Sequence, residues 1–525
     1  MTLLQALNKV ATLQRGAALF VLGWLLVFGL VQLHRVRPFL HTVTKQLTPV
    51  LPWWLLGWAV CYAAAYLAYP LYADHVEASV VVLGEHLRSG LPLYPRELGH
   101  TMDGLLYGPL LAVLNRLSLS LPLDAFLGSK LLALLSSGVA VALCLTGLQD
   151  RRAWLYLGFL GAFDLAFFNR AEPHLLLLTA LALRVARLNN EHQRAWLLGL
   201  LAGLAMSLKV HGVLYVAAVY LWVQPDWMQR PALLPRVAAG LLLGALPWFA
   251  VPGISLPSYL HFLQLASQHG IRPRIALDNA VFLIALWLPL LTLRQGATSA
   301  ALPAALSWRT LISLAAMELP IALLLGAKQG AGCWHLMPFV LLHAQVLDAL
   351  LRHRSLDTTP AATRPTALTL ALLPLASLAI STAFGLAPGL WQHLKQRDDA
   401  QQARTELRQL SASHAGLLLA TGRDRGYELS YLRIDLEQQG VRQIDVPAFI
   451  DLQWAGVSDA PLAAALRDCR IAHLAVPRGE PAFANVSNYS GRPLFSDAVR
   501  QAVAQRFTRV SQTPHFDLYR CQAPT

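Results

Sequence analysis

Long uninterrupted apolar runs limit what this sequence can fold into more than any other feature. They recur from about residue 17 to residue 387, and many approach the roughly 20 apolar residues that an α-helix needs to cross a bilayer. Of the 525 residues, 55% are hydrophobic and 14% are charged, whereas a typical soluble domain has roughly 25% charged residues. These values exclude an ordinary water-soluble enzyme and predict an integral membrane protein.

The apolar runs are rich in Leu and Ala and do not alternate with period two, so they favour helices over a β-barrel. The predicted fold is an all-α polytopic membrane bundle of about 11–13 helices with a small C-terminal soluble α/β domain. Two shorter runs, 195–208 and 211–223, are expected to be half-helices, and 105–123 fits either a crossing or a re-entrant helix. The clearest crossings are expected at residues 17–33, 52–72, 126–148, 153–168, 173–188, 236–251, 277–293, 309–326, 334–351 and 367–387.

The sequence divides into three predicted regions. Residues 1–50 form an N-terminal anchor helix and a cytoplasmic connection, residues 51–390 form the transmembrane domain, and residues 391–525 form the soluble domain. Lys and Arg gather in alternate connections, such as 151–152 and 352–364, and the positive-inside rule places these in the cytoplasm. The other connections and the C-terminal domain then face outward from a bacterial inner (plasma) membrane.

The last region has a different composition, being charged and poor in long apolar runs. Residues 395–412 fit an amphipathic helix, and short buried strands are expected at 416–421, 471–476 and 516–521, with helices at 461–469 and 496–507. Alternation of strands and helices favours a small α/β domain. Cys469 and Cys521 fit a disulfide in an oxidising compartment and two unpaired buried thiols equally well.

Acidic residues mark two of the outward connections. Asp74 ends an apolar run, and a carboxylate at a membrane surface can act as a general base toward a hydroxyl. Glu77 follows three residues later, a spacing that equally fits a capping box at the start of a helix. Glu77, Glu172 and His174 are the candidates for a second acid and acceptor site, although Glu172 and His174 equally fit the start of another helix.

A divalent metal ion is an open alternative at these connections. His75, Glu77, Glu172 and His174 are all acceptable ligands, but no spacing among them specifies a metal site. We therefore expect no metal ligand and no required cofactor other than the donor substrate.

Lys and Arg residues also occur in the outward-facing connections, where the positive-inside rule predicts few of them. A single Lys or Arg there is readily explained by contact with lipid headgroups. Together the cations fit the binding of a phosphate group, whose negative charge must be neutralised when it leaves. The net charge of +13 therefore needs no nucleic-acid partner. The candidate donor phosphate-binding residues are Arg170, Lys209, His211, Arg272, Arg274 and Lys328.

The order of these motifs resembles that of the GT-C glycosyltransferases, polytopic enzymes that use polyprenyl-phosphate sugars, including the dolichyl-phosphate-mannose mannosyltransferase-like families. The resemblance covers about residues 52–350. It implies that Asp74, in a first extracytoplasmic loop at 73–104, activates the acceptor, and that Lys209 and Lys328 contact the donor phosphate. The motifs are Asp74, SGLPLYP at 89–95, YGP at 107–109, NRAEPH at 169–174, SLKVHG at 207–212 and GAKQGAGCWHLMPF at 326–339.

Two positions depart from the pattern of this family. Glu172 stands where many relatives carry Asp, and no Asp-x-Asp pair follows the first helix. The second departure argues against an obligate metal and against the oligosaccharyltransferase branch.

The predicted function is therefore transfer of a hexosyl or pentosyl unit from a polyprenyl-phosphate carrier to an extracytoplasmic glycan, lipid or protein acceptor by inverting displacement. Membrane lipids are expected partners, and nucleic acid is not. A secondary transporter of a lipid-linked or anionic solute is the alternative, because transporters also gather polar groups between helices. The sequence shows no repeated halves, which many transporters have.

Overall fold

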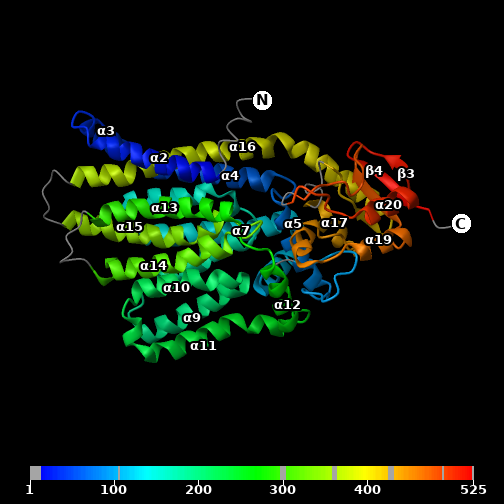
Figure 1. The fold of residues 1–525 in the computed structure, drawn as a ribbon, viewed down its shortest axis with the longest axis horizontal. Helices are drawn as coiled ribbons and strands as arrows, with labels where there is room; N and C mark the ends of the chain where they lie inside the picture. Colours follow the sequence, from blue (N-terminus) through cyan, green and yellow to red (C-terminus); the bar gives the residue numbers. More distant parts are fainter. Residues whose placement is uncertain are drawn as a thin grey trace.

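A helical bundle makes up most of the chain, and a small α/β unit packs against one end of it (Figure 1). The computed structural model describes residues 13–104, 107–295, 303–356, 364–423, 431–487 and 490–522. The bundle helices are α2 (Leu13–Val31), α3 (Arg37–Leu47), α4 (Leu51–Ala68), α5 (His75–Arg88), α6 (Pro109–Leu119), α7 (Ala125–Leu145), α8 (Ala171–Val185), α9 (Glu191–Leu208), α10 (Val213–Val223), α11 (Leu234–Ala245), α12 (Leu256–Ser267), α13 (Pro273–Gln295), α14 (Trp308–Pro320), α15 (Phe339–Leu356) and α16 (Arg364–Ser413).

Five helical segments within the described ranges are long and apolar enough to cross a membrane. They are Leu51–Ala68, Ala125–Leu145, Pro231–Ala250, Pro273–Gln295 and Trp308–Leu325. Several other apolar helices are shorter than a full crossing. The polytopic helical fold is confirmed, whereas the total of about 11–13 crossings stays a prediction.

The segment predicted as a membrane α-helix at 153–168 has a different geometry. Residues Arg151–Ala162 form a 3₁₀ helix, η1, of 12 residues. At about 2.0 Å per residue it spans about 24 Å, against about 18 Å for an α-helix of equal length. It contacts α4, α15 and α16, so packing from several sides determines its geometry, and no local sequence signal announces it.

Two other segments differ from their predicted form. The candidate crossing at 105–123 contains α6, whose 11 residues span about 16 Å and are too short to cross alone. The half-helix expected at 195–208 is the 18-residue α9. It begins earlier than its apolar run because Asn190 caps it, accepting hydrogen bonds from the backbone N–H groups of His192 at 3.0 Å and Gln193 at 3.1 Å.

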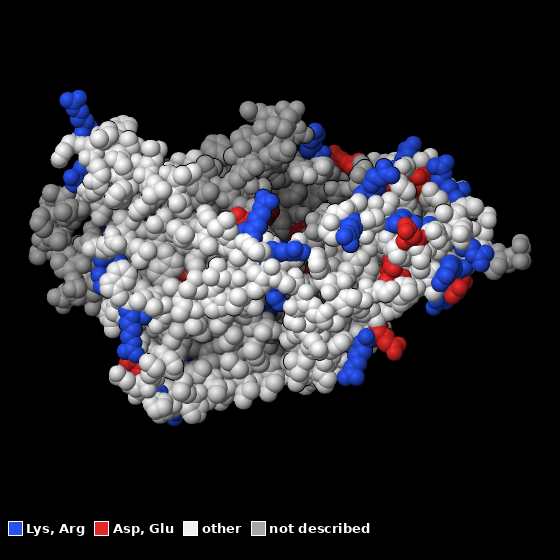
Figure 2. All heavy atoms as spheres, in the orientation of Figure 1, with Lys and Arg blue, Asp and Glu red and all other residues white. Residues whose placement is uncertain are grey.

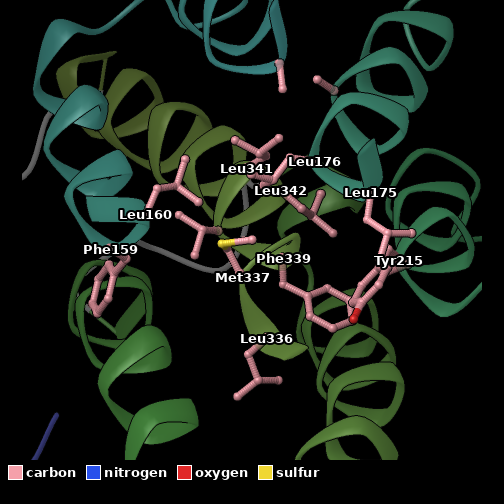
Figure 3. Close-up of a cluster of buried hydrophobic side chains, with 14 of the residues drawn as sticks. Phe159, Leu160, Leu175, Leu176, Tyr215, Leu336, Met337, Phe339, Leu341 and Leu342 are labelled. Atoms are coloured by element: carbon pink, nitrogen blue, oxygen red, sulfur yellow. The ribbon is translucent and has the colours of Figure 1, made fainter. Parts of the chain in front are cut away.

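The bundle core is apolar and tightly interleaved (Figure 3). Phe159 of η1 is 1% exposed, and the α15 residues Phe339 and Leu342 are fully buried. Tyr215 of α10 packs edge-on against Phe339, with ring centroids 4.9 Å apart. These contacts join elements that are distant in the sequence into one core.

One polar network lies inside this apolar core. The Glu318 carboxylate is fully buried and accepts hydrogen bonds from Trp287 Nε1 and His343 Nε2, both at 2.6 Å. The other ring nitrogen of His343 lies 2.9 Å from the Tyr156 hydroxyl. Because each group has a partner, the network stabilises the packing of η1, α13, α14 and α15 without leaving a polar site open to a solute.

Helix α16 runs through the point where the composition changes. The predicted membrane segment at 367–387 and the predicted amphipathic helix at 395–412 are parts of this single helix of 50 residues, about 75 Å long. Figure 1 shows it extending from the bundle to the α/β unit. The predicted boundary at residues 390 and 391 therefore lies within one helix.

The α/β unit contains a four-stranded sheet in the order β1-β2-β4-β3. Strands β1 and β2 are parallel, and the other pairs are antiparallel. The three buried strands predicted from sequence are confirmed, but β3 was missed because its residues after Phe507 are exposed and polar. The elements are β1 (Leu417–Leu419), α17 (Arg433–Glu437), α18 (Val446–Leu452), α19 (Ala460–Arg467), β2 (His473–Pro477), α20 (Asp497–Arg506), β3 (Phe507–Gln512) and β4 (Phe516–Cys521).

The distribution of charged residues on the surface also separates the helical bundle from the α/β unit. Figure 2 shows Lys, Arg, Asp and Glu spread over the α/β unit, whereas most of the bundle surface on this face is free of them. An uncharged belt around a helical bundle is what contact with lipid requires. The chain is thus an integral membrane protein with a polar unit at one end. Within that unit, Cys469 and Cys521 form a disulfide, which decides between the two alternatives that the sequence leaves open.

Candidate active site

Three polar loops meet at the end of the bundle that carries the α/β unit. Each contributes a charged residue at a helix end: Asp74 precedes α5, Arg170 precedes α8, and Lys209 follows α9. All three have extended backbone conformations, with φ of −134°, −139° and −147°. The ends of three helices thus bring together side chains that are far apart in the sequence.

The Asp74 carboxylate is ionised and partly open to water. It accepts a hydrogen bond from Arg170 Nη1 at 2.7 Å, and His75 Nδ1 lies 2.9 Å from its other oxygen. Burial alone would raise the pKa of the Asp74 carboxyl, but the Arg170 guanidinium and His75 outweigh it and hold this pKa well below its usual range. The side chain remains 14% exposed, so a ligand can reach it from outside. We call this opening beside Asp74 the mouth of the site.

Arg170 extends this pair into a chain of alternating charges. Its Nη2 donates to the Tyr107 hydroxyl at 3.0 Å, and its Nε lies 3.5 Å from Glu172 Oε2. Lys209 Nζ forms an ion pair with the other oxygen of Glu172 and lies 4.8 Å above the Tyr107 ring. Two carboxylates and two cations therefore share one buried cluster, which we call the charge chain: Asp74, Arg170, Glu172 and Lys209.

Glycine at position 108 allows the loops of this cluster to approach closely. The Gly108 N–H donates to the Leu208 carbonyl at 2.8 Å, and a Cβ on Gly108 would lie 2.1 Å from the Ser207 carbonyl oxygen. The Tyr94 hydroxyl donates to the Tyr107 carbonyl at 2.8 Å and fixes the same loop from the other side. The tyrosine and glycine of the sequence motifs thus place Tyr107 between Arg170 and Lys209.

Glu77 lies beneath the site instead of in its mouth. It is fully buried and accepts hydrogen bonds from the backbone N–H groups of Ala73 at 2.8 Å, Asp74 at 3.0 Å and Asn169 at 2.8 Å, and also from the Tyr66 hydroxyl. This is the capping role that the spacing allowed. Glu77 joins the Asp74 loop to the Arg170 loop, so its contribution is to position both.

The predicted histidines border the charge chain but make no hydrogen bond to it in the described structure. His174 is 4% exposed, and its Nδ1 lies 2.9 Å from the Ser136 hydroxyl. The ring of His211 faces that of His335, with centroids 5.0 Å apart. His75, Glu77, Glu172 and His174 do not converge, and in the described ranges no three His, Cys, Asp or Glu side chains form a group that could hold a metal ion.

The remaining predicted cations form an outer group where the loop before α13 pairs with the loop after α14. Lys328 pairs with Ile271 in an isolated β-bridge, and its Nζ lies 3.4 Å from the Ala266 carbonyl. The Arg272 guanidinium lies 5.0 Å from the ring centre of Trp454, a residue of the α/β unit. Arg274 is exposed at the start of α13. The structure therefore places Arg170 and Lys209 in the charge chain and the other three cations outside it.

Two residues near the site were not predicted as site residues. Tyr107 belongs to the YGP motif, but nothing in the sequence indicated that its hydroxyl would contact an arginine. Asp451 belongs to the α/β unit, and its carboxylate interacts with His75 and Arg170. A long-range contact of this kind has no local sequence signal, because the two residues come from different domains.

Comparisons with known proteins identify the fold. No protein-family model and no curated protein matches the sequence. The crystal structure of ArnT from Cupriavidus metallidurans bound to undecaprenyl phosphate matches with a TM-score of 0.54 at 13% identity, over 88% of this chain and 96% of that chain. The chain has the fold of ArnT. The apo structure of the same ArnT gives a TM-score of 0.53 at 14% identity, over 89% of this chain and 97% of that chain.

The likeness to ArnT extends beyond the membrane helices. The sheet of the α/β unit begins at Leu417 of 525 residues, so a match over 88% of the chain also includes part of this unit. The fold predicted from the sequence, a polytopic helical bundle with a small C-terminal α/β domain, is confirmed and is the fold of ArnT.

Proposed function

We propose that this protein is a membrane glycosyltransferase that moves a hexosyl or pentosyl unit from a polyprenyl phosphate to an acceptor outside the cytoplasm. The observation that carries the proposal is the charge chain, which gathers an ionised carboxylate and two cations at one mouth. Such a set can both receive the proton of an acceptor hydroxyl and neutralise a departing phosphate. The ArnT fold supports the same chemistry.

The charge chain is balanced before any ligand binds. Arg170 and Lys209 are each paired with a carboxylate, so the four charges sum to zero. A phosphate entering the mouth competes with Asp74 for the Arg170 guanidinium, since arginine binds phosphate and carboxylate by the same fork of N–H groups. Donor binding therefore releases Asp74 from its partner and makes it a stronger base.

The proposed reaction is a single inverting displacement. Asp74 accepts the proton of the acceptor hydroxyl while its oxygen attacks the anomeric carbon of the sugar. The bond between that carbon and the phosphate oxygen breaks, and the polyprenyl phosphate leaves with its charge balanced by Arg170 and Lys209. Lys328, Arg272 and Arg274 of the outer group are proposed to attract the donor phosphate toward the mouth.

A groove on the lipid-facing side fits the polyprenyl chain. It has a volume of about 490 Å³, lies between α4, α7 and η1, and is lined almost entirely by apolar side chains. Its lining includes Ala166 and Phe167, which directly precede the loop that carries Arg170. A chain in this groove would hold its phosphate at the charge chain. ArnT was crystallised with undecaprenyl phosphate, which supports a polyprenyl ligand of this kind.

Two observations support a location of the site outside the cytoplasm. The cations of the charge chain are in connections that the positive-inside rule leaves outside, and Cys469 and Cys521 form a disulfide. Both support an outward-facing site and α/β unit in a bacterial inner membrane. The acceptor is then a glycan, lipid or protein of the cell envelope.

The test is donor consumption by the purified protein in lipid nanodiscs. Labelled hexosyl and pentosyl polyprenyl phosphates would be supplied with methyl glycosides and envelope lipids as acceptors. We expect sugar to move to an acceptor with release of one polyprenyl phosphate per transfer, and no change on Asp226→Asn, an exposed pair with Arg230 at the far end of α10. A secondary transporter would leave every donor intact while moving solute into proteoliposomes.

A further inference from the structure

The short helix α18 of the α/β unit packs against α5, the helix that begins at the Asp74 mouth. Asp445 caps this helix, accepting from the Ala448 N–H at 3.1 Å, and also accepts a hydrogen bond from Ser79 of α5 at 2.8 Å. At the other end of α18, His269 Nε2 lies 2.9 Å from the Asp451 carbonyl oxygen. Helix α18 is thus tied to α5 and to the loop before α13.

The apolar side of α18 is part of the bundle core. Ala448 and Leu452 are each 2% exposed and belong to the same buried cluster as the membrane helices. This burial joins α18 to the bundle more closely than a surface contact would. The helix therefore forms a fixed wall at the mouth of the site.

The Asp451 carboxylate projects from this wall without a partner. Among the described residues, no group donates a hydrogen bond to it, although the side chain is only partly exposed. Burial raises the pKa of the Asp451 carboxyl to about 7, and the nearby charges of His75 and Arg170 only partly oppose this. A buried carboxyl group without donors gains when a ligand supplies hydroxyl groups.

An aromatic residue follows this carboxylate by about one turn of helix. Trp454 follows Asp451 by three residues, a spacing that makes side chains neighbours on a helical surface. The indole is 37% exposed and also lies against Arg272 of the loop that binds α18. A carboxyl group one helical turn from a partly exposed aromatic ring matches a sugar ring, which has hydroxyl groups at its edge and an apolar face.

We propose that Asp451 and Trp454 bind a carbohydrate acceptor, with Asp451 contacting one of its hydroxyl groups across the mouth from Asp74. The inference rests on the proposed glycosyltransferase function and narrows its acceptor class from glycan, lipid or protein to a sugar-bearing molecule. It assigns the α/β unit a role in acceptor binding and makes Asp451 an acceptor-binding residue.

The experiment measures binding without a donor, so it is independent of sugar transfer. The purified full-length protein in nanodiscs would be titrated with a panel of methyl hexosides and methyl pentosides. We expect at least one to bind, and we expect Asp451→Ala to weaken that binding about tenfold or more, the loss expected for a hydrogen bond to a charged group. Trp454→Ala should also weaken it, whereas Trp454→Phe should restore most of the affinity.

The matched control is Asp468→Asn, because Asp468 is 61% exposed on the same domain and pairs only with Arg470 in the described structure. Equal affinity for wild type and Asp451→Ala, or no binding of any glycoside by the wild type, would overturn the inference. Asp451→Ala keeps the backbone carbonyl that His269 contacts, and an unchanged unfolding temperature would confirm that the variant folds. If glycosides bind but the donor-consumption assay shows no transfer, the acceptor site is supported and the proposed glycosyltransferase function is contradicted.

Discussion

Arg170 donates to Asp74 from one nitrogen of its guanidinium at 2.7 Å and to Tyr107 from another at 3.0 Å. The same side chain lies 3.5 Å from Glu172, so one planar group connects the proposed base to the second acid of the site. This arrangement is the basis for the first two predictions.

Asp74→Asn should abolish most sugar transfer. The amide keeps the size of the side chain but cannot accept the proton of the acceptor, so we expect kcat to fall by about 10²–10⁴. The measurement is the initial rate of sugar transfer at saturating donor, with the unfolding temperature as a check on folding. More than a third of the wild-type rate in this variant would show that another group is the base.

Arg170→Lys should retain the charge and lose the geometry. One ammonium cannot contact Asp74, Glu172 and Tyr107 together, whereas the guanidinium does. We expect kcat to fall by about 10²–10³, as for loss of one donor to a developing negative charge. Arg230→Lys is the matched control, because Arg230 pairs with Asp226 on the surface at the far end of α10, and its rate should stay within about twofold of wild type.

Gly108→Ala should disrupt the site through its backbone. The new Cβ would lie 2.1 Å from the Ser207 carbonyl oxygen and force the Tyr107 loop away from Lys209. Overpacking of this kind costs about 1–3 kcal/mol, so both the unfolding temperature and the transfer rate should fall. Gly57→Ala, where nothing lies within 4 Å of the added carbon, should leave both unchanged.

The disulfide should stabilise the α/β unit alone. It joins residues 52 positions apart, and a loop of this length corresponds to about 4 kcal/mol. We expect Cys469→Ser with Cys521→Ser to lower the unfolding temperature of this unit, while Cys61→Ser leaves it unchanged because Cys61 is free. Alkylation before and after reduction, read by mass spectrometry, would reveal the bond. Two reactive thiols at 469 and 521 without reductant would contradict it.

His515 should link the sheet to α16 in a pH-dependent way. Its two ring nitrogens each lie 3.0 Å from a carboxylate of α16, those of Glu406 and Asp399. Burial lowers the pKa of His515, but these two carboxylates outweigh it, and the net shift is upward. The stabilisation by charged His515 is therefore fully present below about pH 6.5 and is lost as pH rises through the raised pKa.

The variant His515→Gln tests this link. The difference in unfolding temperature between wild type and His515→Gln should be largest near pH 6 and shrink by pH 9. A difference that is constant over this range would show that His515 acts through packing instead of charge.

Hydropathy and charge can be read from short stretches of sequence, and they predicted the features of the fold that depend on such stretches. The apolar runs predicted the helical fold and the buried strands. Because successive connections lie on alternate sides of the membrane, their order also predicted that the loops of Asp74, Arg170 and Lys209 meet at one end. The geometry of η1 and the continuity of α16 did not follow, because both depend on packing against elements far away in the sequence.

Individual roles within the site were harder to predict. The sequence could not decide whether Glu77 caps a helix or serves as an acid, because that depends on Tyr66 and Asn169, which lie on other elements. The same holds for Asp451, whose approach to Arg170 requires the α/β unit to pack against the bundle. Side-chain identity and spacing carry no information about such contacts.

The unbroken course of α16 sets the orientation of everything beyond it. A flexible linker would let the sheet reorient freely relative to the bundle. An α-helix instead fixes this orientation, because it turns by about 100° and rises about 1.5 Å with each residue. Adding one residue between the membrane half and the sheet half of these 50 would swing α18 around the helix axis and away from the mouth. The number of residues in α16 therefore determines the direction in which α18 faces. Substitutions within α16 should be tolerated far more readily than insertions or deletions.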